Sequence, residues 1–444
     1  MKTYKVGMVS LGCPKNQVDA EIMLSVLSEN GYEITGDETQ ADVIIINTCG
    51  FIADAKKEAI ENILEVAQLK TEGQLKALIV TGCMAERYRD EILSEMPEVD
   101  AVVGIGSNMH IAAIVNAALQ GCPYNEFLEK ENLQLDHTRI LTTPSYSAYL
   151  RIADGCDNKC TYCAIPMIRG RYRSRKMEDI LKEAETLARS GAKEIILIAQ
   201  DTTKYGQDLY GTLCLPELLD RLCEIEGIQW IRILYTYPDK ITDQLLETIR
   251  RQEKVLPYLD IPLQHASGTV LNRMNRTGDF ESLSALIAKI RKAVPDIVIR
   301  TTFIVGFPGE TEQDFEQLAR FVKQTKFNRM GCFTYSPEEG TPAAKMPEQI
   351  DESVKSRRQE ILMTEQSVVN EEICGRMLET TIDVLVEGYD GMNKCWYGRS
   401  KADAPEIDGK VFFMSKKTYQ PGEILKVKVI DTIDYDLLGE VVGA

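Results

Sequence analysis

Residues 148–171 read AYLRIADGCDNKCTYCAIPMIRGR: a short apolar run that predicts a strand, followed directly by three cysteines in a CxxxCxxC pattern. Further strand candidates follow at intervals of about 30 residues, with helical patterns between them. Strands that alternate with helices predict a parallel sheet with right-handed crossovers. We therefore expect an incomplete (β/α)6 barrel, with the cysteine loop at the carboxyl ends of its strands. The five further strands are expected at 193–201, 229–236, 258–265, 298–306 and 329–337.

The cysteines of this loop, Cys156, Cys160 and Cys163, are suited to bind a 4Fe-4S cluster. A loop can place three thiolates at three corners of the cube, whereas a structural zinc site needs four ligands and this loop offers no fourth Cys or His. The remaining iron would stay open for a chelating substrate, as the reductive cleavage of a sulfonium requires. Tyr162 lies within the triplet, where we expect it either against a bound nucleoside or packed on the loop.

The first 120 residues repeat a pattern of apolar strand, turn and helix, which predicts an open parallel α/β sheet with four strands, the last of them in DAVVG. Cys13, Cys49 and Cys83 each follow one of its first three strands, KVGMVSLG, ADVIIINT and KALIVTG. Because the carboxyl ends of parallel strands meet at one edge of a sheet, we expect the three thiols to face one another and to hold a second cluster. For each cysteine alone, simple burial at a strand end is the alternative.

The remaining chain suggests how the domains are divided. A polar stretch at 121–147 breaks the periodicity, and a continuous helical pattern at 347–374 precedes short β runs with Asp-Gly turns. These runs predict a small antiparallel β-barrel. We expect an N-terminal domain over 1–122, the barrel with its linker helix over 142–375, and the small barrel over 378–444.

Two further features are weaker candidates for binding. Gly306 and Gly309, in TTFIVGFPGET, follow the fifth barrel strand, where backbone amides can approach a cofactor closely. The arginines of IRGRYRSRK alternate, so that on an extended segment they would share one side, suited to an anionic group; a solvated charge run is the alternative. They are Arg169, Arg171, Arg173 and Arg175.

Apart from His265, the remaining histidines and cysteines indicate no further functional site. His265, at the end of the fourth barrel strand, is the one well-placed histidine of three, with a structural role as the alternative. Six of the twelve cysteines show no comparable placement and are expected to be structural or incidental. These six are Cys122, Cys214, Cys223, Cys332, Cys374 and Cys395.

Composition narrows the class of protein. The 444 residues are 44% hydrophobic and 27% charged, without an apolar run of the ~18 residues that span a bilayer and without signal-peptide features at the start. We therefore expect a cytoplasmic enzyme, in which cysteines serve metal binding, catalysis or burial rather than disulfides. The net charge of −17 disfavours nucleic-acid binding and favours a basic protein partner.

Along nearly its whole length the chain resembles the methylthiotransferases of the radical S-adenosylmethionine (SAM) superfamily. The resemblance implies an auxiliary 4Fe-4S cluster on Cys13, Cys49 and Cys83, a SAM-cleaving 4Fe-4S cluster on Cys156, Cys160 and Cys163, and a C-terminal TRAM domain. It implies methylthiolation of an aspartate β-carbon in small-subunit ribosomal protein twelve, with an electron donor such as flavodoxin or ferredoxin. The segments that carry it are SLGCPKNQVDAE, INTCGFI, VTGCMAERY, GCDNKCTYCAIPMIRGRYRSR, DIPLQHAS, FIVGFPGET and EIDGKVFF.

Two alternatives remain open at this point. The tRNA-modifying branch of the family methylthiolates an adenosine, but its cysteine segment tends to read YGCQMN rather than SLGCPKN. Residues 380–444 contain eleven acidic and eight basic residues, a poor surface for tRNA phosphates, so tRNA is not the expected partner. The second alternative is a non-enzymatic interaction protein that holds zinc in its cysteines.

Overall fold

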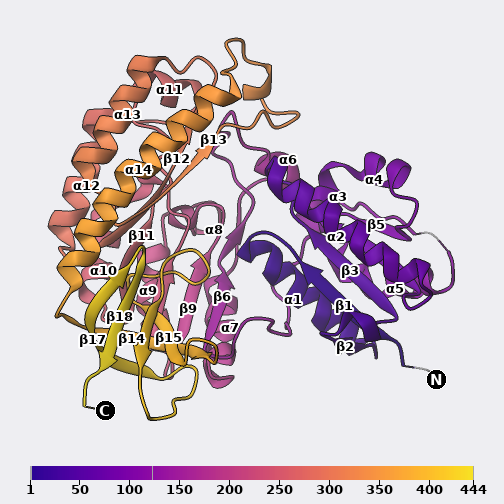
Figure 1. Ribbon diagram of the computed structural model, residues 1–444. Helices are drawn as coiled ribbons and strands as arrows, with labels where there is room; N and C mark the ends of the chain where they lie inside the picture. Colours follow the sequence, from indigo (N-terminus) through magenta and orange to yellow (C-terminus); the bar gives the residue numbers. More distant parts are fainter. Residues whose placement is uncertain (1–2, 123, 444) are drawn as a thin grey trace.

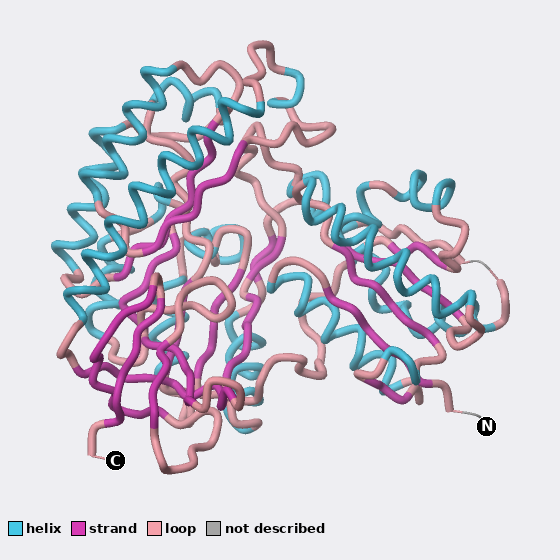
Figure 2. The backbone as a smooth tube through the Cα atoms, in the orientation of Figure 1, coloured by secondary structure: helices cyan, strands magenta, loops and turns pink. Residues whose placement is uncertain are grey.

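The structure is a computed structural model that describes residues 3–122 and 124–443. Figure 1 shows an N-terminal α/β domain beside a larger sheet-and-helix body, with a small β-barrel at the C-terminal end, and Figure 2 shows the same elements by type. Among the described residues, no helix is both long and apolar enough to cross a membrane. The predicted fold class, α/β with a third, β-barrel domain, is confirmed.

The N-terminal domain is a five-stranded parallel sheet in the order β2-β1-β3-β4-β5. The four expected strands are present, and the additional edge strand β2 has only three residues of mixed polarity, too few for a periodic pattern. Apolar cores lie on both faces of the sheet. The strands are β1 Lys5–Ser10, β2 Glu33–Thr35, β3 Val43–Thr48, β4 Ala77–Gly82 and β5 Ala101–Val103, and the helices are α1 Pro14–Glu29, α2 Ala53–Thr71, α3 Cys83–Arg87, α4 Arg89–Glu95 and α5 Ile111–Leu119.

The central domain is a six-stranded, all-parallel sheet in the order β13-β12-β11-β10-β9-β6, which confirms the six expected βα units. Its strands are β6 Ser147–Arg151, β9 Glu194–Ile198, β10 Trp230–Ile233, β11 Val255–Asp260, β12 Val298–Val305 and β13 Arg329–Thr334. A two-stranded ladder of β7 Ala153–Asp154 and β8 Arg173–Ser174 flanks the cysteine loop. The helices are α6 Ile165–Arg169, α7 Met177–Arg189, α8 Gln207–Tyr210, α9 Leu215–Cys223, α10 Asp243–Arg251, α11 Gly268–Arg273, α12 Phe280–Ala293 and α13 Glu312–Thr325.

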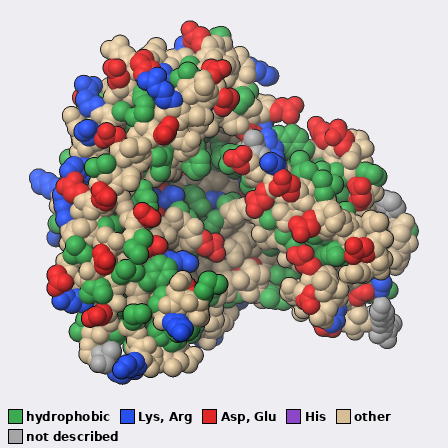
Figure 3. Space-filling view, in the orientation of Figure 1, with side chains coloured by type: hydrophobic (Ala, Val, Ile, Leu, Met, Phe, Trp, Pro, Cys, Tyr) green, Lys and Arg blue, Asp and Glu red, His purple; other side chains and the backbone are tan. Residues whose placement is uncertain are grey.

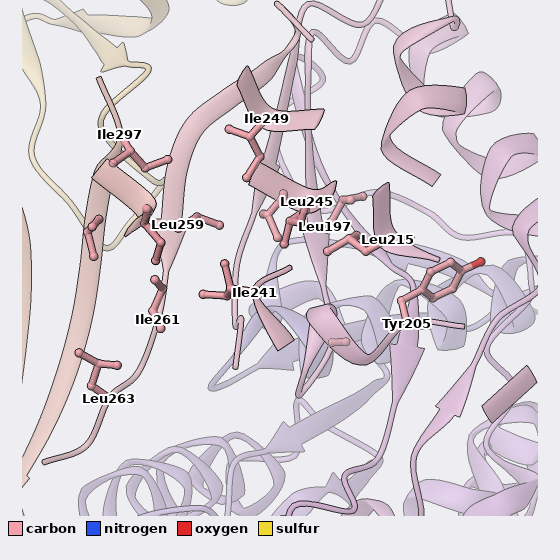
Figure 4. Close-up of a cluster of buried hydrophobic side chains, with 14 of the residues drawn as sticks. Leu197, Tyr205, Leu215, Ile241, Leu245, Ile249, Leu259, Ile261, Leu263 and Ile297 are labelled. Carbon is pink, nitrogen blue, oxygen red and sulfur yellow. The ribbon is translucent and has the colours of Figure 1, made fainter. Parts of the chain in front are cut away.

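The core of this domain lies between the sheet and its outer helices. Figure 4 shows Leu197 of β9 and Leu259 of β11 beside Leu245 and Ile249 of α10, and all four are at most 3% exposed. Burial of such side chains contributes roughly 1.5–3 kcal/mol each relative to exposure. This packing fixes the strands, and with them the loops at their carboxyl ends.

The C-terminal domain is a closed barrel in the order β14-β15-β16-β18-β17, reached through the 26-residue helix α14, Glu352–Met377. Its pairs are antiparallel, as predicted, except that β16 and β18 run parallel. Strands β15 and β18 gave no clear alternation in the sequence and were not anticipated. The strands are β14 Thr381–Asp390, β15 Cys395–Ser400, β16 Val411–Met414, β17 Ile424–Ile433 and β18 Asp436–Val441.

Helix α1 docks the N-terminal domain onto the sheet of the central domain. Val18 and Ile22 of this helix join a buried cluster with strand residues that face away from the outer helices, among them Ile196 and Trp230. Beside them, the carboxylate of Asp19 accepts hydrogen bonds from Arg151 and Arg169, which are fully buried. The carboxyl edge of the N-terminal sheet therefore faces the central domain.

A second buried ionic group joins the C-terminal barrel to the central sheet. Glu194 of β9 is fully buried, and its carboxylate lies 2.5 Å from Nη2 of Arg399 and 2.8 Å from Nε of Arg232. We expect Glu194→Gln to lower the free energy of unfolding by about 3 kcal/mol, because buried Arg232 loses its counter-charge and buried Arg399 keeps only that of Glu387. Urea titration measures this, and Glu226→Ala, at an exposed site, is the control, expected to change stability by less than about 0.5 kcal/mol.

The same site predicts a pH dependence. Burial alone would raise the pKa of Glu194, but Arg399 and Arg232 outweigh it and lower the pKa from 4.5 to about 2. A carboxylate with a depressed folded-state pKa stabilises the protein above its unfolded-state pKa and loses that effect as the pH falls through the folded-state value. The stability difference between wild type and Glu194→Gln is thus expected to be full above pH 4.5 and to shrink toward pH 2. A difference that stayed constant over this range would contradict the assignment.

Candidate functional site

The loop with Cys156, Cys160 and Cys163 is held in shape by its neighbours. The amide of Cys156 donates to the carbonyl of Gly170 at 3.2 Å, and that of Cys163 donates to the carbonyl of Cys160 at 3.1 Å. Gly155 has a φ of +76°, and a Cβ at this position would lie 2.0 Å from the carbonyl oxygen of Arg171. Only glycine allows the backbone to approach so closely, and this approach starts the turn that carries the cysteines.

The three thiols of this loop share one protected environment. Burial raises the pKa of Cys156 to about 11 and that of Cys163 to about 12, and each thiol is close enough to Cys160 to be affected by its charge. Buried thiols with raised pKa values are unreactive on their own and become ligands when a metal displaces their protons. The donor set therefore suits a cluster that brings its own positive charge.

Cys160 lies in a polar and aromatic group that the sequence did not indicate. Nη1 of Arg276 lies 3.8 Å from the Cys160 sulfur, and its guanidinium packs 4.3 Å from the ring centre of Tyr237. Burial and the nearby Cys160 raise the pKa of Tyr162 well above its usual range. Arg276 follows α11 and stands more than 100 residues from the triplet, so only the packing of that loop reveals it.

Cys13, Cys49 and Cys83 come together at the carboxyl edge of the N-terminal sheet, as expected from the adjacent strands β1, β3 and β4. A Cβ on Gly12 would lie 2.9 Å from the Cys49 sulfur, so the first two loops are in contact. Burial, with smaller contributions from the nearby Cys13 and Cys49 and against the opposing charge of Arg169, raises the pKa of Cys83 to about 12. The juxtaposition is thus observed, whereas the role of these thiols as cluster ligands stays a prediction.

The described residues form no compact site for a single ion. Among residues 3–122 and 124–443, no three Cys, His, Asp or Glu side chains converge closely enough to hold one metal ion. A cubane cluster is held at separate corners, whereas a structural zinc ion takes four ligands around one point. Which of the two these thiols hold stays a prediction.

A cavity of about 880 Å³ lies between the N-terminal domain and the central sheet. Figure 3 shows the hollow between the two bodies. Phe51 and Ile52 line it from the loop that follows Cys49, and Tyr162 lines it from the other cysteine loop, so both loops reach the same space. Its size is in the usual range for small-molecule sites. The central sheet contributes Tyr235, Gln264, Arg300, Thr302, Ile304 and Phe333.

Two wall residues of the cavity have strained backbones. Tyr235 and Gln264, after β10 and β11, have φ angles of +60° and +70°, a region that side chains other than glycine rarely adopt. The amide of Tyr235 donates to Asp260 at 3.1 Å, and the ammonium of Lys15 lies 3.2 Å from the centre of the Tyr235 ring. Strain of this kind concentrates at functional sites, where the surrounding structure holds it in place.

The glycines predicted to contact a cofactor lie beside the cavity rather than in its wall. Gly306 and Gly309 have positive φ angles, and a Cβ on either would meet the side chain of Lys355 or Arg273, respectively. Neither glycine is among the residues that line the 880 Å³ space, whereas Tyr162 is. Cofactor contact by these three residues remains a prediction.

The arginine run does not form the single anion-binding face that was considered, nor is it one solvated run. Arg169 pairs with Asp19 and Asp154 and lies 3.6 Å from the Cys83 sulfur. The others diverge because the ladder of β7 and β8 and the turn around Gly170 point them in different directions. Arg171 is exposed and pairs with Asp157, Arg173 donates to the carbonyl of Glu131, and Arg175 pairs with Asp136 and Glu183.

His265 lies in the interior of the central domain and is not among the residues that line the cavity. It is fully buried, its Nδ1 accepts a hydrogen bond from the amide of Ser267, and Nε2 lies 3.9 Å from Glu310. Burial lowers its pKa to about 3, so the ring is neutral at physiological pH.

Comparisons with known proteins agree with this division of the chain. Family models match residues 5–104 (Uncharacterized protein family UPF0004), 150–322 (Radical SAM superfamily) and 380–442 (TRAM domain). Among solved structures, the radical S-adenosylmethionine methyltransferase TsrM from Kitasatospora setae has a TM-score of 0.57 at 13% identity and covers 77% of each chain. At that identity the likeness concerns the fold alone.

Curated relatives match over nearly the whole length. A protein of Thermoanaerobacter sp. (strain X514) is 51% identical over 98% of this chain and 99% of its own. A protein of Caldanaerobacter subterraneus is 52% identical over 98% and 99%, and one of Clostridioides difficile is 48% identical over 98% of both chains. All three are named ribosomal protein uS12 methylthiotransferase RimO.

Proposed function

This chain belongs to the RimO family of ribosomal protein uS12 methylthiotransferases, and we propose that it replaces a hydrogen on the β-carbon of an aspartate of uS12 by a methylthio group. It is a radical SAM enzyme with a TRAM domain. The observation that carries the proposal is that the loop after Cys49 and the loop of Cys156, Cys160 and Cys163 both line one cavity, within a chain about half identical to its relatives along its full length.

The residues of this chain have distinct roles in the proposal. Cys156, Cys160 and Cys163 hold one 4Fe-4S cluster, and the three N-terminal cysteines, Cys13, Cys49 and Cys83, hold another. When bound, the first cluster would supply the electron that cleaves SAM and the second would supply the sulfur, with the methyl group coming from a second SAM. Tyr162, at the rim of the first site, packs against the nucleoside of SAM. Arg276 fixes the position of Cys160, because its hydrogen bonds join that sulfur to the carbonyl of Pro262.

An ionic contact between the N-terminal and central domains helps to enclose the cavity. Glu338, in the loop after β13, lines the cavity and is 4% exposed. Its Oε2 lies 3.0 Å from Nζ of Lys56 and 2.7 Å from Nη1 of Arg87, both in the N-terminal domain. This ionic contact joins the two domains beside the reaction space and so excludes water from it, which protects reactive species from side reactions.

The partners follow from charge and chemistry. An acidic protein of net charge −17 suits a basic ribosomal protein as substrate. The reaction needs an external electron donor, for which a flavodoxin or ferredoxin is the proposed class, and we place the enzyme in the cytoplasm.

The proposed domains extend over residues 1–122, 142–375 and 378–444.

The direct test uses the full chain reconstituted without oxygen, supplied with SAM, a reductant and purified uS12. Tandem mass spectrometry is expected to find one methylthio group, in place of one hydrogen, on a single aspartate of uS12. Unmodified uS12 together with methylthiolated adenosine in a parallel tRNA reaction would overturn the proposal in favour of the tRNA branch.

A further inference from the structure

The ammonium group of Lys15 is a buried cation without an ionic partner. Lys15 is 7% exposed, and within the described part of the chain its Nζ forms no ion pair within 4 Å and no hydrogen bond. The Lys15 Nζ lies over the face of the Tyr235 ring, 3.2 Å from the ring centre. The buried arginines nearby, Arg151 and Arg169, are both paired with Asp19. A cation–π contact offsets only part of the cost of burying a charge, so the Lys15 site is incomplete as it stands.

The position of Lys15 connects the two parts of the proposed site. It lies in the first turn of α1, two residues after Cys13, one of the three clustered N-terminal thiols. Tyr235, beneath its ammonium, belongs to the wall of the cavity that both cysteine loops reach. Nζ of Lys15 is thus close in sequence to the proposed source of sulfur and in contact with a ring that lines the space that a substrate would enter.

We propose that Lys15 binds the side-chain carboxylate of the acceptor aspartate of uS12, an inference that rests on the proposed function and identifies a determinant of its substrate class. The β-carbon that receives sulfur is bonded directly to the carboxylate carbon. An ammonium–carboxylate hydrogen bond of about 2.8 Å therefore holds the β-carbon within roughly 5 Å of Nζ. Lys15 selects a carboxylate and at the same time orients the carbon beside it toward Cys13.

The sequence position of Lys15 makes the arrangement rigid. Pro14 is the first residue of α1, and the amides of Asn16 and Gln17 donate to the carbonyl of Cys13 at 2.8 and 3.1 Å. The lysine backbone is thereby fixed in the same helical turn that begins at Cys13. On the other side, Asp260 holds the backbone of Tyr235 through a 3.1 Å hydrogen bond. Little of the binding energy is then needed to order the site.

The test compares binding of two forms of uS12, one with the acceptor aspartate and one with asparagine in its place. Lys15→Met keeps the length of the side chain without its charge, Lys15→Arg keeps the charge, and Lys57→Met removes a lysine from the exposed face of α2 as a matched control. All variants are used as reconstituted full-length protein. Iron and sulfide analysis of about eight atoms each per chain verifies that both clusters are present.

Wild type and Lys57→Met are expected to bind the aspartate form more tightly than the asparagine form. Lys15→Met is expected to weaken binding of the aspartate form about 100-fold, as for a lost charged hydrogen bond, and to leave the asparagine form nearly unchanged. Lys15→Arg is expected to restore part of the preference. An undiminished preference for aspartate in fully loaded Lys15→Met would overturn the inference.

SAM also has a carboxylate, so its affinity is measured separately by equilibrium dialysis. If Lys15→Met weakens SAM binding and leaves the aspartate preference of uS12 intact, Lys15 serves the cofactor and the inference is wrong. A loss of iron confined to Lys15→Met would instead assign the lysine to the auxiliary cluster and would also overturn it. If the wild-type protein with both clusters fails to modify uS12 at all, the proposed function is wrong. This outcome differs from a failure of the inference on Lys15, which is measured as binding of the two forms of uS12.

Discussion

Replacing Cys156, Cys160 and Cys163 together by alanine is expected to abolish formation of 5′-deoxyadenosine from SAM and to reduce iron from about eight to about four atoms per chain. The reason is that this loop has no other thiol to substitute. The remaining cysteines of the central domain, Cys214, Cys223 and Cys332, lie on or beside other helices and strands. The measurements are chromatography of the nucleoside and iron analysis after anaerobic reconstitution.

The control for this variant is Cys122→Ala, which removes an exposed thiol outside both triplets. It is expected to retain iron and SAM cleavage at wild-type levels. Undiminished cleavage in the triple variant would refute the role of the loop. Circular dichroism distinguishes the expected result from unfolding, because the apolar cores of the two domains do not include these thiols and the fold is expected to persist.

Replacing Cys13, Cys49 and Cys83 by alanine is expected to separate the two halves of the reaction. Some SAM cleavage is retained, because the loop of the central domain keeps its own hydrogen bonds, whereas methylthiolation of uS12 is lost with the proposed sulfur source. Arg169 loses contact with the Cys83 sulfur but keeps Asp19 and Asp154 as partners, so the contact between the domains survives. Iron is again expected to fall to about four atoms per chain.

The readouts for this second variant are 5′-deoxyadenosine and the mass of uS12 from the same reaction. Cys395→Ala, in the C-terminal barrel, is the matched control and is expected to support both. Normal methylthiolation by the N-terminal triple variant would remove the auxiliary site from the proposal. Loss of cleavage as well as methylthiolation, with the fold intact, would show that the two sites do not act separately.

Much of the architecture could be predicted from local patterns. The six strands of the central sheet and four of the five N-terminal strands are short β-branched runs at regular intervals. In parallel sheets, the carboxyl ends of adjacent strands meet at one edge. This rule predicts that Cys13, Cys49 and Cys83 lie close together, as they do in the structure. The strands that the sequence does not predict, β2, β8, β15 and β18, are short or of mixed polarity and depend on their partners for their conformation.

Other features of the site were beyond the reach of sequence reasoning. The alternation of Arg169, Arg171, Arg173 and Arg175 suggested one face, but carboxylates on other elements bind Arg169 and Arg175 separately. Cofactor contact by Gly306 and Gly309 stays a prediction, and the structure adds that the side chains of Lys355 and Arg273 approach them closely. In each case the deciding partner is remote in sequence, which no periodicity records.

The sequence by itself determined the strands, the helices and the two groups of three cysteines, because these depend on local periodicity and on the regular geometry of parallel sheets. Only the tertiary structure decided that Lys15 lies on the ring of Tyr235, 220 residues away, and that both cysteine loops border one cavity. The physical reason is that α1 docks on the central sheet through apolar packing and buried ion pairs. Such docking depends on the shapes and charges of surfaces formed only after each domain has folded.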